Sequence, residues 1–169
     1  MRIVLIGYRG SGKSTVATLL SGQLHWPVVS TDNLIVRQIG RPIADFVREE
    51  GWPAFRKVES TVIAGIDPAL QQIIDCGGGV IESPENMTCL TQESTVVWLN
   101  VPEQVVLERL VRAGDRPLLS ESDMAGDVLI NYRRRLPLYR RYADLELNTA
   151  TRTPAQICRS ITDFIANPS

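Results

Sequence analysis

Residues 7–14 read Gly-Tyr-Arg-Gly-Ser-Gly-Lys-Ser and fit the pattern Gly-x-x-x-x-Gly-Lys-[Ser/Thr]. An apolar run at residues 3–6 precedes this stretch, and apolar residues at helical spacing follow it at residues 15–24. A strand would therefore deliver the loop, and its glycines would let backbone N–H groups surround phosphate oxygens at the positive end of a helix dipole. The stretch predicts a P-loop, which binds nucleotide phosphates, in preference to a Gly-rich turn before a helix.

The P-loop pattern assigns roles to the side chains at its end. Lys13 can reach the β- and γ-phosphates, and the Ser14 hydroxyl can bind Mg²⁺. We expect Lys13 to face solvent in the phosphate cradle, so that its loss would cost little stability. The predicted nucleotide-binding residues of this segment are Gly10, Ser11, Gly12, Lys13, Ser14 and Thr15.

The composition is that of one soluble globular domain. The chain has 169 residues, of which 44% are hydrophobic and 22% charged, and its net charge of −1 gives no overall field to attract nucleic acid or a membrane. Cys76, Cys89 and Cys158 are odd in number and widely spaced, which argues against a disulfide framework or a zinc site. We interpret Cys76 as a small buried residue. Because we find no signal peptide and no apolar segment long enough to span a membrane, we expect a cytoplasmic protein. We also expect a monomer.

Apolar runs and helical patterns alternate along the chain. We expect strands at residues 1–6, 27–30, 71–76, 95–100 and 145–147. We expect helices at residues 15–24 and 34–40, from Pro42 to a break at Gly51, and again at 55–64. Further helices are expected at 127–142, where Pro137 would kink or divide the helix, and after Ser83, Val101 and Thr153. This alternation predicts the α/β class, with a five-stranded parallel sheet between helices on both faces. The P-loop, Asp32 and residues 77–79 follow three of these strands, so they should meet in one cleft at the carboxyl edge of the sheet.

A P-loop occurs in ATPases, GTPases and kinases, so it does not by itself select a reaction. A GTPase would need an Asn-Lys-x-Asp motif for guanine, whereas the only lysines are Lys13 and Lys57 and neither has that context. Motor and transporter ATPases are usually longer chains. A kinase that uses ATP to phosphorylate a small molecule fits the length best.

Further motifs follow the P-loop in a fixed order. Asp32 follows the second strand, Phe-Arg-x-x-Glu occupies residues 55–59, and three glycines occupy residues 77–79. Arg-Pro-Leu-Leu occupies residues 116–119, and Arg-x-Pro-Leu-Tyr occupies residues 135–139. Together with the P-loop, this set resembles the shikimate kinase family over nearly the whole chain. The resemblance implies a three-layer P-loop kinase fold, the use of ATP with Mg²⁺, and phosphoryl transfer to the 3-hydroxyl of shikimate.

The resemblance also implies substrate-binding roles. Arg56 and Arg135 match the arginines that hold the shikimate carboxylate, and a planar guanidinium suits a carboxylate because it can bind both oxygens. Asp32 matches the residue that binds the acceptor hydroxyl and can take its proton, although it could also cap a helix. The glycines that would let the backbone approach the substrate ring, or would form only a turn, are Gly77, Gly78 and Gly79.

Each of these assignments has a plainer alternative. Arg56 and Arg135 could be solvated surface residues, and Arg133 and Arg134 compete with Arg135 for its role. Glu59 could orient Arg56, or it could form only an i,i+3 pair on a helix.

The irregular residues 112–126 match the mobile lid of the family, within a single domain at residues 1–169. There Arg116 would close over the phosphates and stabilise the charge of the transition state, or else lie on the lid surface. Arg109 and Arg152 match positions beside adenine, a stacking role that many residues can fill.

One position departs from the family pattern, which places Asp-x-Asp after the second strand. Residues 30–32 read Ser-Thr-Asp, so the first carboxylate, which helps to hold Mg²⁺ through water, is replaced by an uncharged hydroxyl. We therefore expect an active enzyme with a raised Mg²⁺ requirement, which Ser30→Asp would lower. The alternatives are a kinase of another small hydroxy acid, such as gluconate, and a catalytically weak ATP-binding regulatory protein.

Overall fold

The computed structural model describes residues 1–106, 108 and 124–167, with only the backbone of residues 124–128. Its strands form one sheet in the order β2-β3-β1-β4-β5, and all neighbouring strands are parallel. The strands are β1 (Arg2–Ile6), β2 (Val28–Ser30), β3 (Gln72–Asp75), β4 (Ser94–Asn100) and β5 (Leu145–Asn148). The predicted five-stranded parallel sheet is confirmed.

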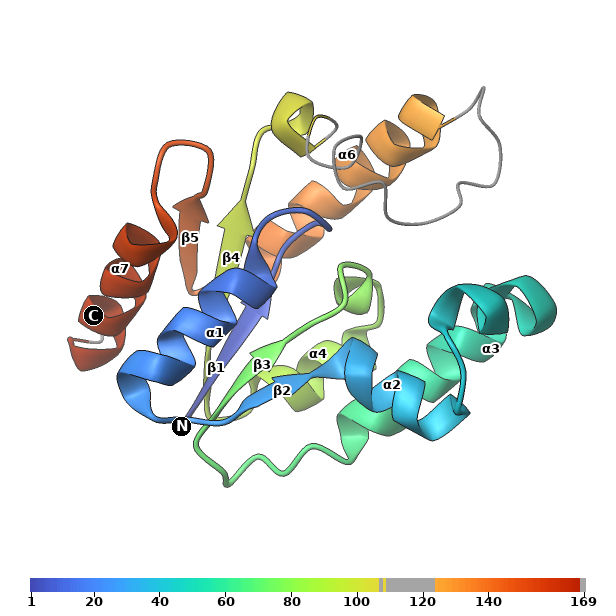
Figure 1. Cartoon of the computed structure of the whole chain (residues 1–169), viewed down its shortest axis with the longest axis horizontal. Coiled ribbons are helices and arrows are strands. Elements are labelled where there is room, and N and C mark those ends of the chain that lie inside the picture. The colour runs from blue at the N-terminus through green and yellow to red at the C-terminus, as the bar shows by residue number, and fades with distance from the viewer. Residues whose placement is uncertain (107, 109–123, 168–169) are drawn as a thin grey trace.

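Helices cover both faces of this sheet (Figure 1). They are α1 (Lys13–Leu24), α2 (Thr31–Ile39), α3 (Ile43–Ala64), the 3-10 helix η1 (Val80–Glu82), α4 (Pro84–Thr91), α6 (Met124–Tyr142) and α7 (Pro154–Ala166). Residues 103–106 and 108 are also helical, as expected after Val101. The result is the predicted three-layer arrangement of the α/β class.

The central strand β1 separates two hydrophobic cores. Ile3 and Leu5 pack on one face with apolar residues of α1 and α7. Val4 and Ile6 pack on the other face with residues of α4, α6 and the end of α3. Because successive side chains of a strand point to opposite faces, a strand covered on both faces is apolar over most of its length. This explains why the run before the P-loop shows no polar alternation.

Local capping sets several helix ends. The Thr153 hydroxyl accepts a hydrogen bond from Gln156 N at 3.3 Å, and Gln156 Oε1 accepts one from Thr153 N at 2.8 Å, which confirms the predicted capping box of α7. Ser83 caps α4 as predicted. Helix α6 continues through Pro137, so this proline does not divide it. Since α6 begins at Met124, residues 124–126 of the expected lid are helical, while residues 112–123 lie outside the described residues.

Helix α3 contains the predicted break at Gly51. This residue has φ 83° and ψ 166°, and a kink there separates two helical segments. Glycine tolerates this conformation because it has no Cβ. The kink gives the second segment, which carries Arg56 and Glu59, a direction of its own.

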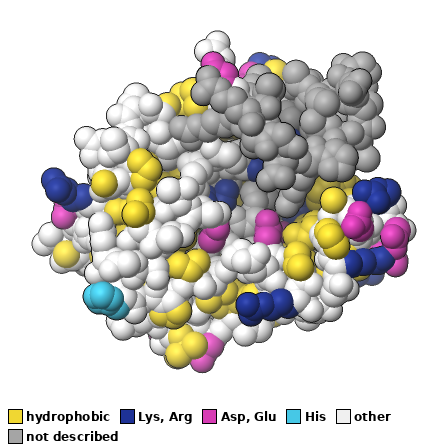
Figure 2. All heavy atoms as spheres, in the orientation of Figure 1, with side chains coloured by type: hydrophobic (Ala, Val, Ile, Leu, Met, Phe, Trp, Pro, Cys, Tyr) yellow, Lys and Arg dark blue, Asp and Glu magenta, His cyan; other side chains and the backbone are white. Residues whose placement is uncertain are grey.

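Charges of both signs are mixed on the described surface (Figure 2). On α3 and just before it, Arg41 pairs with Glu49 and Glu50, and Arg48 pairs with Asp45 at 3.0 Å. This mixture accords with the net charge of −1. Among the helices of the described ranges, none is long and apolar enough to cross a membrane.

Candidate active site

The P-loop connects β1 to the N-terminus of α1. Gly10 and Gly12 have φ angles of 77° and 90°, and Gly12 is the N-cap of α1 without a capping side chain. The first backbone N–H groups of the helix are therefore available to an anion. Ser14 and Thr15 are exposed in the first turn, whereas the buried Ser11 hydroxyl has no hydrogen-bond partner within the described part of the chain. These features fit the phosphate-binding role that the motif predicts.

Lys13 is buried, contrary to the expectation that it faces solvent. It is 8% exposed, and its Nζ donates hydrogen bonds to the carbonyl oxygens of Gly7 at 2.8 Å and Tyr8 at 3.1 Å. Burial lowers the pKa of this ammonium group, and nearby Asp75 opposes that effect. Because the loop backbone wraps around the lysine, its removal would leave two carbonyl groups without this donor. Lys13→Ala should therefore also cost stability.

Asp75 ends β3 beside the P-loop and belongs to none of the sequence motifs described above. Its Oδ2 accepts a hydrogen bond from Ser14 Oγ at 2.6 Å. Asp75 is the parallel-register partner of Leu5 in β1, the strand that enters the P-loop. An acidic residue at the end of an apolar strand could have been read as a metal-site candidate in a P-loop protein. The next residue, Cys76, is buried as predicted, and burial raises the pKa of its thiol.

Ser30, and not Asp32, caps α2. Ser30 Oγ accepts a hydrogen bond from Asn33 N at 3.3 Å, and Asp32 lies in the first helical turn. Thr31 Oγ1 accepts a hydrogen bond from Gly77 N at 2.9 Å, which joins the start of α2 to the glycine segment. A Cβ atom added to Gly77 would lie 2.8 Å from Asp32 Oδ1. The missing side chain at Gly77 therefore leaves room for the Asp32 carboxylate.

The glycine segment after β3 lies between the P-loop and Arg56. A Cβ atom added to Gly78 would lie 3.3 Å from Arg9 N in the P-loop, and one added to Gly79 would overlap the Arg56 guanidinium. The Tyr139 hydroxyl donates a hydrogen bond to Gly78 O, and burial raises the pKa of Tyr139, which keeps it protonated. The missing side chains thus let the glycine backbone lie close to Asp32, the P-loop and Arg56. The approach of this backbone to a substrate ring stays a prediction.

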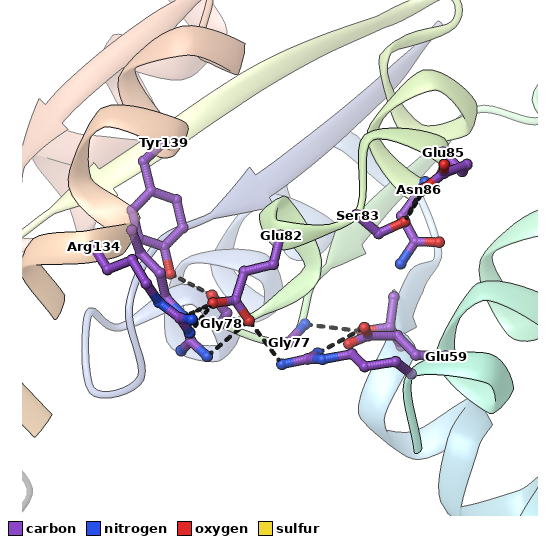
Figure 3. Close-up of polar contacts among 12 residues, drawn as sticks. Glu59, Gly77, Gly78, Glu82, Ser83, Glu85, Asn86, Arg134 and Tyr139 are labelled. Carbon is purple, nitrogen blue, oxygen red and sulfur yellow. Dashed lines mark hydrogen bonds and ion pairs between the residues drawn. The ribbon is translucent and has the colours of Figure 1, made fainter. Parts of the chain in front are cut away.

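Three arginines converge on the carboxylate of Glu82 (Figure 3). Arg56 Nη2 lies 3.1 Å from Glu82 Oε2. Arg135 binds both oxygens, with Nε 3.2 Å from Oε1 and Nη2 3.2 Å from Oε2, and Arg134 pairs with Oε1. The side chain of Arg135 is 16% exposed, against 61% for Arg134 and 69% for Arg133. Among the three neighbouring arginines, the predicted Arg135 is therefore the least exposed.

Glu59 holds Arg56 from the opposite side. Its Oε2 lies 2.7 Å from Arg56 Nη1, and its side chain is 2% exposed. Burial raises the pKa of Glu59, while the charge of Arg56 and their hydrogen bond oppose the rise. The Arg56 guanidinium also lies 5.6 Å from the ring centroid of Trp52 and 5.3 Å from that of Phe55. Arg56 is therefore a positioned group that is only partly exposed.

The other predicted site residues are Arg152, Arg109 and Arg116. Arg152 is exposed, and its Nη1 donates a hydrogen bond to Ser160 Oγ of α7 at 3.0 Å. Arg109 and Arg116 lie outside the described residues. An open pocket of about 880 Å³ adjoins the clustered groups, and Arg56, Glu82 and Arg134 are among its lining residues. From this side, a small acid would meet Arg56 and Arg134.

A P-loop at the carboxyl edge of a parallel sheet, next to guanidinium groups that bind a carboxylate, fits a P-loop kinase that acts on small acidic molecules. The sequence model of one such family matches residues 9–166 and is described as shikimate kinase. The chain belongs to the shikimate kinase family. A shikimate kinase of Dehalococcoides mccartyi is 37% identical over 163 residues, which cover 96% of this chain and 92% of the relative. One of Moorella thermoacetica is 35% identical over 163 residues, 96% of this chain and 93% of the relative.

Solved structures agree with this assignment. Shikimate kinase from Acinetobacter baumannii in complex with shikimate superposes with a TM-score of 0.89 at 29% identity, over 98% of this chain and 92% of that one. A gluconokinase from Sinorhizobium meliloti shares only the fold, with a TM-score of 0.62 at 17% identity over 98% of this chain and 91% of that one. The family comparison therefore favours the shikimate kinase interpretation over the gluconate alternative.

Proposed function

We propose that this protein transfers the γ-phosphoryl group of ATP to the 3-hydroxyl of shikimate, in the synthesis of aromatic amino acids. The observation that supports this most directly is the convergence of Arg56 and Arg135 on one carboxylate. Shikimate is a ring acid with three hydroxyl groups, so its site needs planar cations for the carboxylate and an acceptor for the hydroxyls. Asp32, next to the glycine segment, supplies that acceptor.

In the proposed reaction, the 3-hydroxyl oxygen forms a bond to the γ-phosphorus of ATP. The bond from this phosphorus to the bridging oxygen breaks, ADP leaves, and Asp32 accepts the hydroxyl proton. Lys13 neutralises charge on the β- and γ-phosphates, and Arg116 adds a second cation in the family pattern. The roles of Arg109 and Arg152 beside adenine belong to the same proposal.

The donors at the start of α1 fit Mg²⁺. Ser14 presents an exposed hydroxyl 2.6 Å from a carboxylate oxygen, and Mg²⁺ prefers such hard oxygen ligands. Ser14 would hold the ion, which neutralises phosphate charge when it is bound. We further propose that the protein acts in the cytoplasm as a monomer.

The test of this function is an assay of ADP formation in the presence of ATP and Mg²⁺. The assay is run without an acceptor, with shikimate, and with gluconate. We expect turnover with shikimate alone, and Lys13→Ala should abolish it. Stimulation by gluconate instead would replace the proposed substrate. ATP binding without stimulation by either acid would favour the regulatory alternative.

A further inference from the structure

Ser30, which stands where the family pattern has an acidic residue, already forms a hydrogen bond with the backbone of α2. Ser30 is the last residue of β2, and its hydroxyl caps α2 by accepting a hydrogen bond from Asn33 N at 3.3 Å. A hydroxyl also brings no charge to a cation. Ser30 therefore does not replace the missing carboxylate chemically.

A carboxylate is present one strand away, at the same level of the sheet. The parallel-register partner of Ser30 on β3 is Asp75, which on its other side pairs with Leu5 of β1. Asp75 thus lies between the strand that carries Ser30 and the strand that enters the P-loop. Its Oδ2 accepts a hydrogen bond at 2.6 Å from Ser14, the P-loop hydroxyl that suits Mg²⁺.

We infer that Asp75 supplies, from β3, the acidic group that Ser30 lacks on β2, and that it positions Ser14 and the divalent cation that accompanies the nucleotide. This inference rests on the proposed function. When Ser14 donates its hydrogen to the carboxylate, the oxygen lone pairs remain free for the cation. The carboxylate also adds negative charge beside a site that otherwise contains hydroxyl and phosphate oxygens. The acidic group that the family pattern places after β2 is thus found at the end of β3 in this chain.

The hydrogen bond between Ser14 and Asp75 could instead have a purely structural role, and the two roles predict different effects on metal binding. If Asp75 only held the start of α1 in place, its loss would affect nucleotide binding equally with and without metal. If Asp75 positions the cation, its loss affects the binding of metal to the nucleotide complex. The affinity for the metal therefore separates the two roles.

The test measures Mn²⁺ binding to the complex of the full chain with ADP, by electron paramagnetic resonance, and ADP binding without metal, by calorimetry. Asp75→Asn keeps the shape and an acceptor for Ser14 but removes the charge. We expect it to lower Mn²⁺ affinity by about 10- to 100-fold, the range for partners of metal ligands, with little change in metal-free ADP binding. Asp67→Asn, an exposed carboxylate before the other end of β3, is the matched control and should leave both affinities unchanged.

A double variant with the carboxylate on β2 instead of β3 tests directly whether the two positions can replace each other. In Asp75→Ser, the added change Ser30→Asp should restore much of the Mn²⁺ affinity, whereas Ser30→Asp alone should change it little. The effects of the two substitutions on Mn²⁺ affinity should therefore not add. With Asp75 present, we no longer expect the raised Mg²⁺ requirement that Ser30 alone suggested. Thermal unfolding of each variant identifies any that fails to fold, and Asp75→Asn and Asp75→Ser provide two independent removals of the charge.

Mn²⁺ affinity that is unchanged in both Asp75 variants, or metal-free ADP binding that weakens equally, would overturn the inference. If Ser30→Asp does not restore Mn²⁺ affinity in Asp75→Ser, a carboxylate on β2 cannot replace the one on β3. None of these measurements contains shikimate, so they decide the role of Asp75 even if the acceptor is a different acid. Turnover with shikimate separately decides the proposed function.

Discussion

At the scale of single residues, Glu82 binds Arg56 and Arg135, the two arginines that we propose hold the substrate carboxylate. Its oxygens lie 3.1 Å from Arg56 and 3.2 Å from Arg135, and its side chain is 21% exposed. A substrate carboxylate must therefore compete with Glu82 for these partners. Glu82→Gln removes the competing charge and should tighten shikimate binding by about 1 kcal/mol, roughly fivefold, as for a partly exposed ion pair. Calorimetric titration with shikimate measures this change.

Glu85→Gln provides the control for that experiment. Glu85 lines the same pocket but accepts a hydrogen bond from Ser83 at 2.9 Å, so its variant should bind shikimate as the wild type does. Weaker shikimate binding in Glu82→Gln would mean that Glu82 orients the arginines and does not compete with the substrate.

A second prediction concerns the effect of the Arg56 guanidinium on shikimate binding. Arg56→Lys keeps the charge but loses the planar fork that reaches both Glu59 and a carboxylate ligand. Shikimate binding should weaken by about 1.5–3 kcal/mol, the range for a hydrogen bond to a charged group, with ATP binding nearly unchanged. Arg48→Lys, on the first segment of α3, is the matched control and should have no effect on either ligand. Equal losses of shikimate and ATP affinity in Arg56→Lys would place Arg56 elsewhere in the site.

Sequence motifs indicated some of these residues and could not indicate others. Arg56, Arg135 and Asp32 belong to recognisable patterns, and the structure places Arg56 and Arg135 together. Glu82 belongs to no such pattern, and its partner Arg135 is 53 positions away. The burial of Lys13 also could not be read from the motif, because it depends on how the loop backbone wraps around Nζ. Contacts that only folding creates are invisible to local sequence patterns.

At the scale of secondary-structure elements, the break in α3 gives a third prediction. Gly51 has φ 83°, where any side chain is strained, whereas Gly22 lies in helical α1 with open space where a Cβ atom would be added. Gly51→Ala should lower the free energy of unfolding by about 1–3 kcal/mol, and Gly22→Ala should raise it by about 0.4–1 kcal/mol. Denaturant unfolding of both variants measures these opposite effects. A neutral Gly51→Ala would show that the kink does not depend on glycine.

Element boundaries were predictable where a local chemical signal marks them. The break at Gly51, the cap at Ser83 and the capping box at Thr153 were all read correctly from the sequence. The start of α2 was placed too late, because Ser30 was considered for a metal role and not as a helix cap. The strands were found from their apolar runs, but their spatial order depends on tertiary contacts. The neighbourhood of Ser30 and Asp75 follows from that order and was therefore missed.

At the scale of the whole molecule, the site joins parts of the chain that are far apart in sequence. The P-loop follows β1, Asp32 lies on α2, Arg56 on α3, and Arg135 on α6. The glycine segment after β3 contacts the P-loop, α2, α3 and α6. Ligands that bind across such a site stabilise the folded chain as a unit, because the unfolded chain does not hold these groups together.

The last prediction uses this property. Mg²⁺-ADP or shikimate, each at about 100 times its dissociation constant, should stabilise the fold by about 2.7 kcal/mol. For a domain of this size, that corresponds to a rise in Tm of about 5–10 °C. At the same ligand concentrations, Arg56→Lys should lose most of the rise caused by shikimate but keep the rise caused by Mg²⁺-ADP, because its guanidinium belongs to the carboxylate site. Gluconate at the shikimate concentration is the control and should leave Tm unchanged. If gluconate and shikimate raise Tm equally, the arginines recognise any small hydroxy acid, and selectivity must arise elsewhere in the chain.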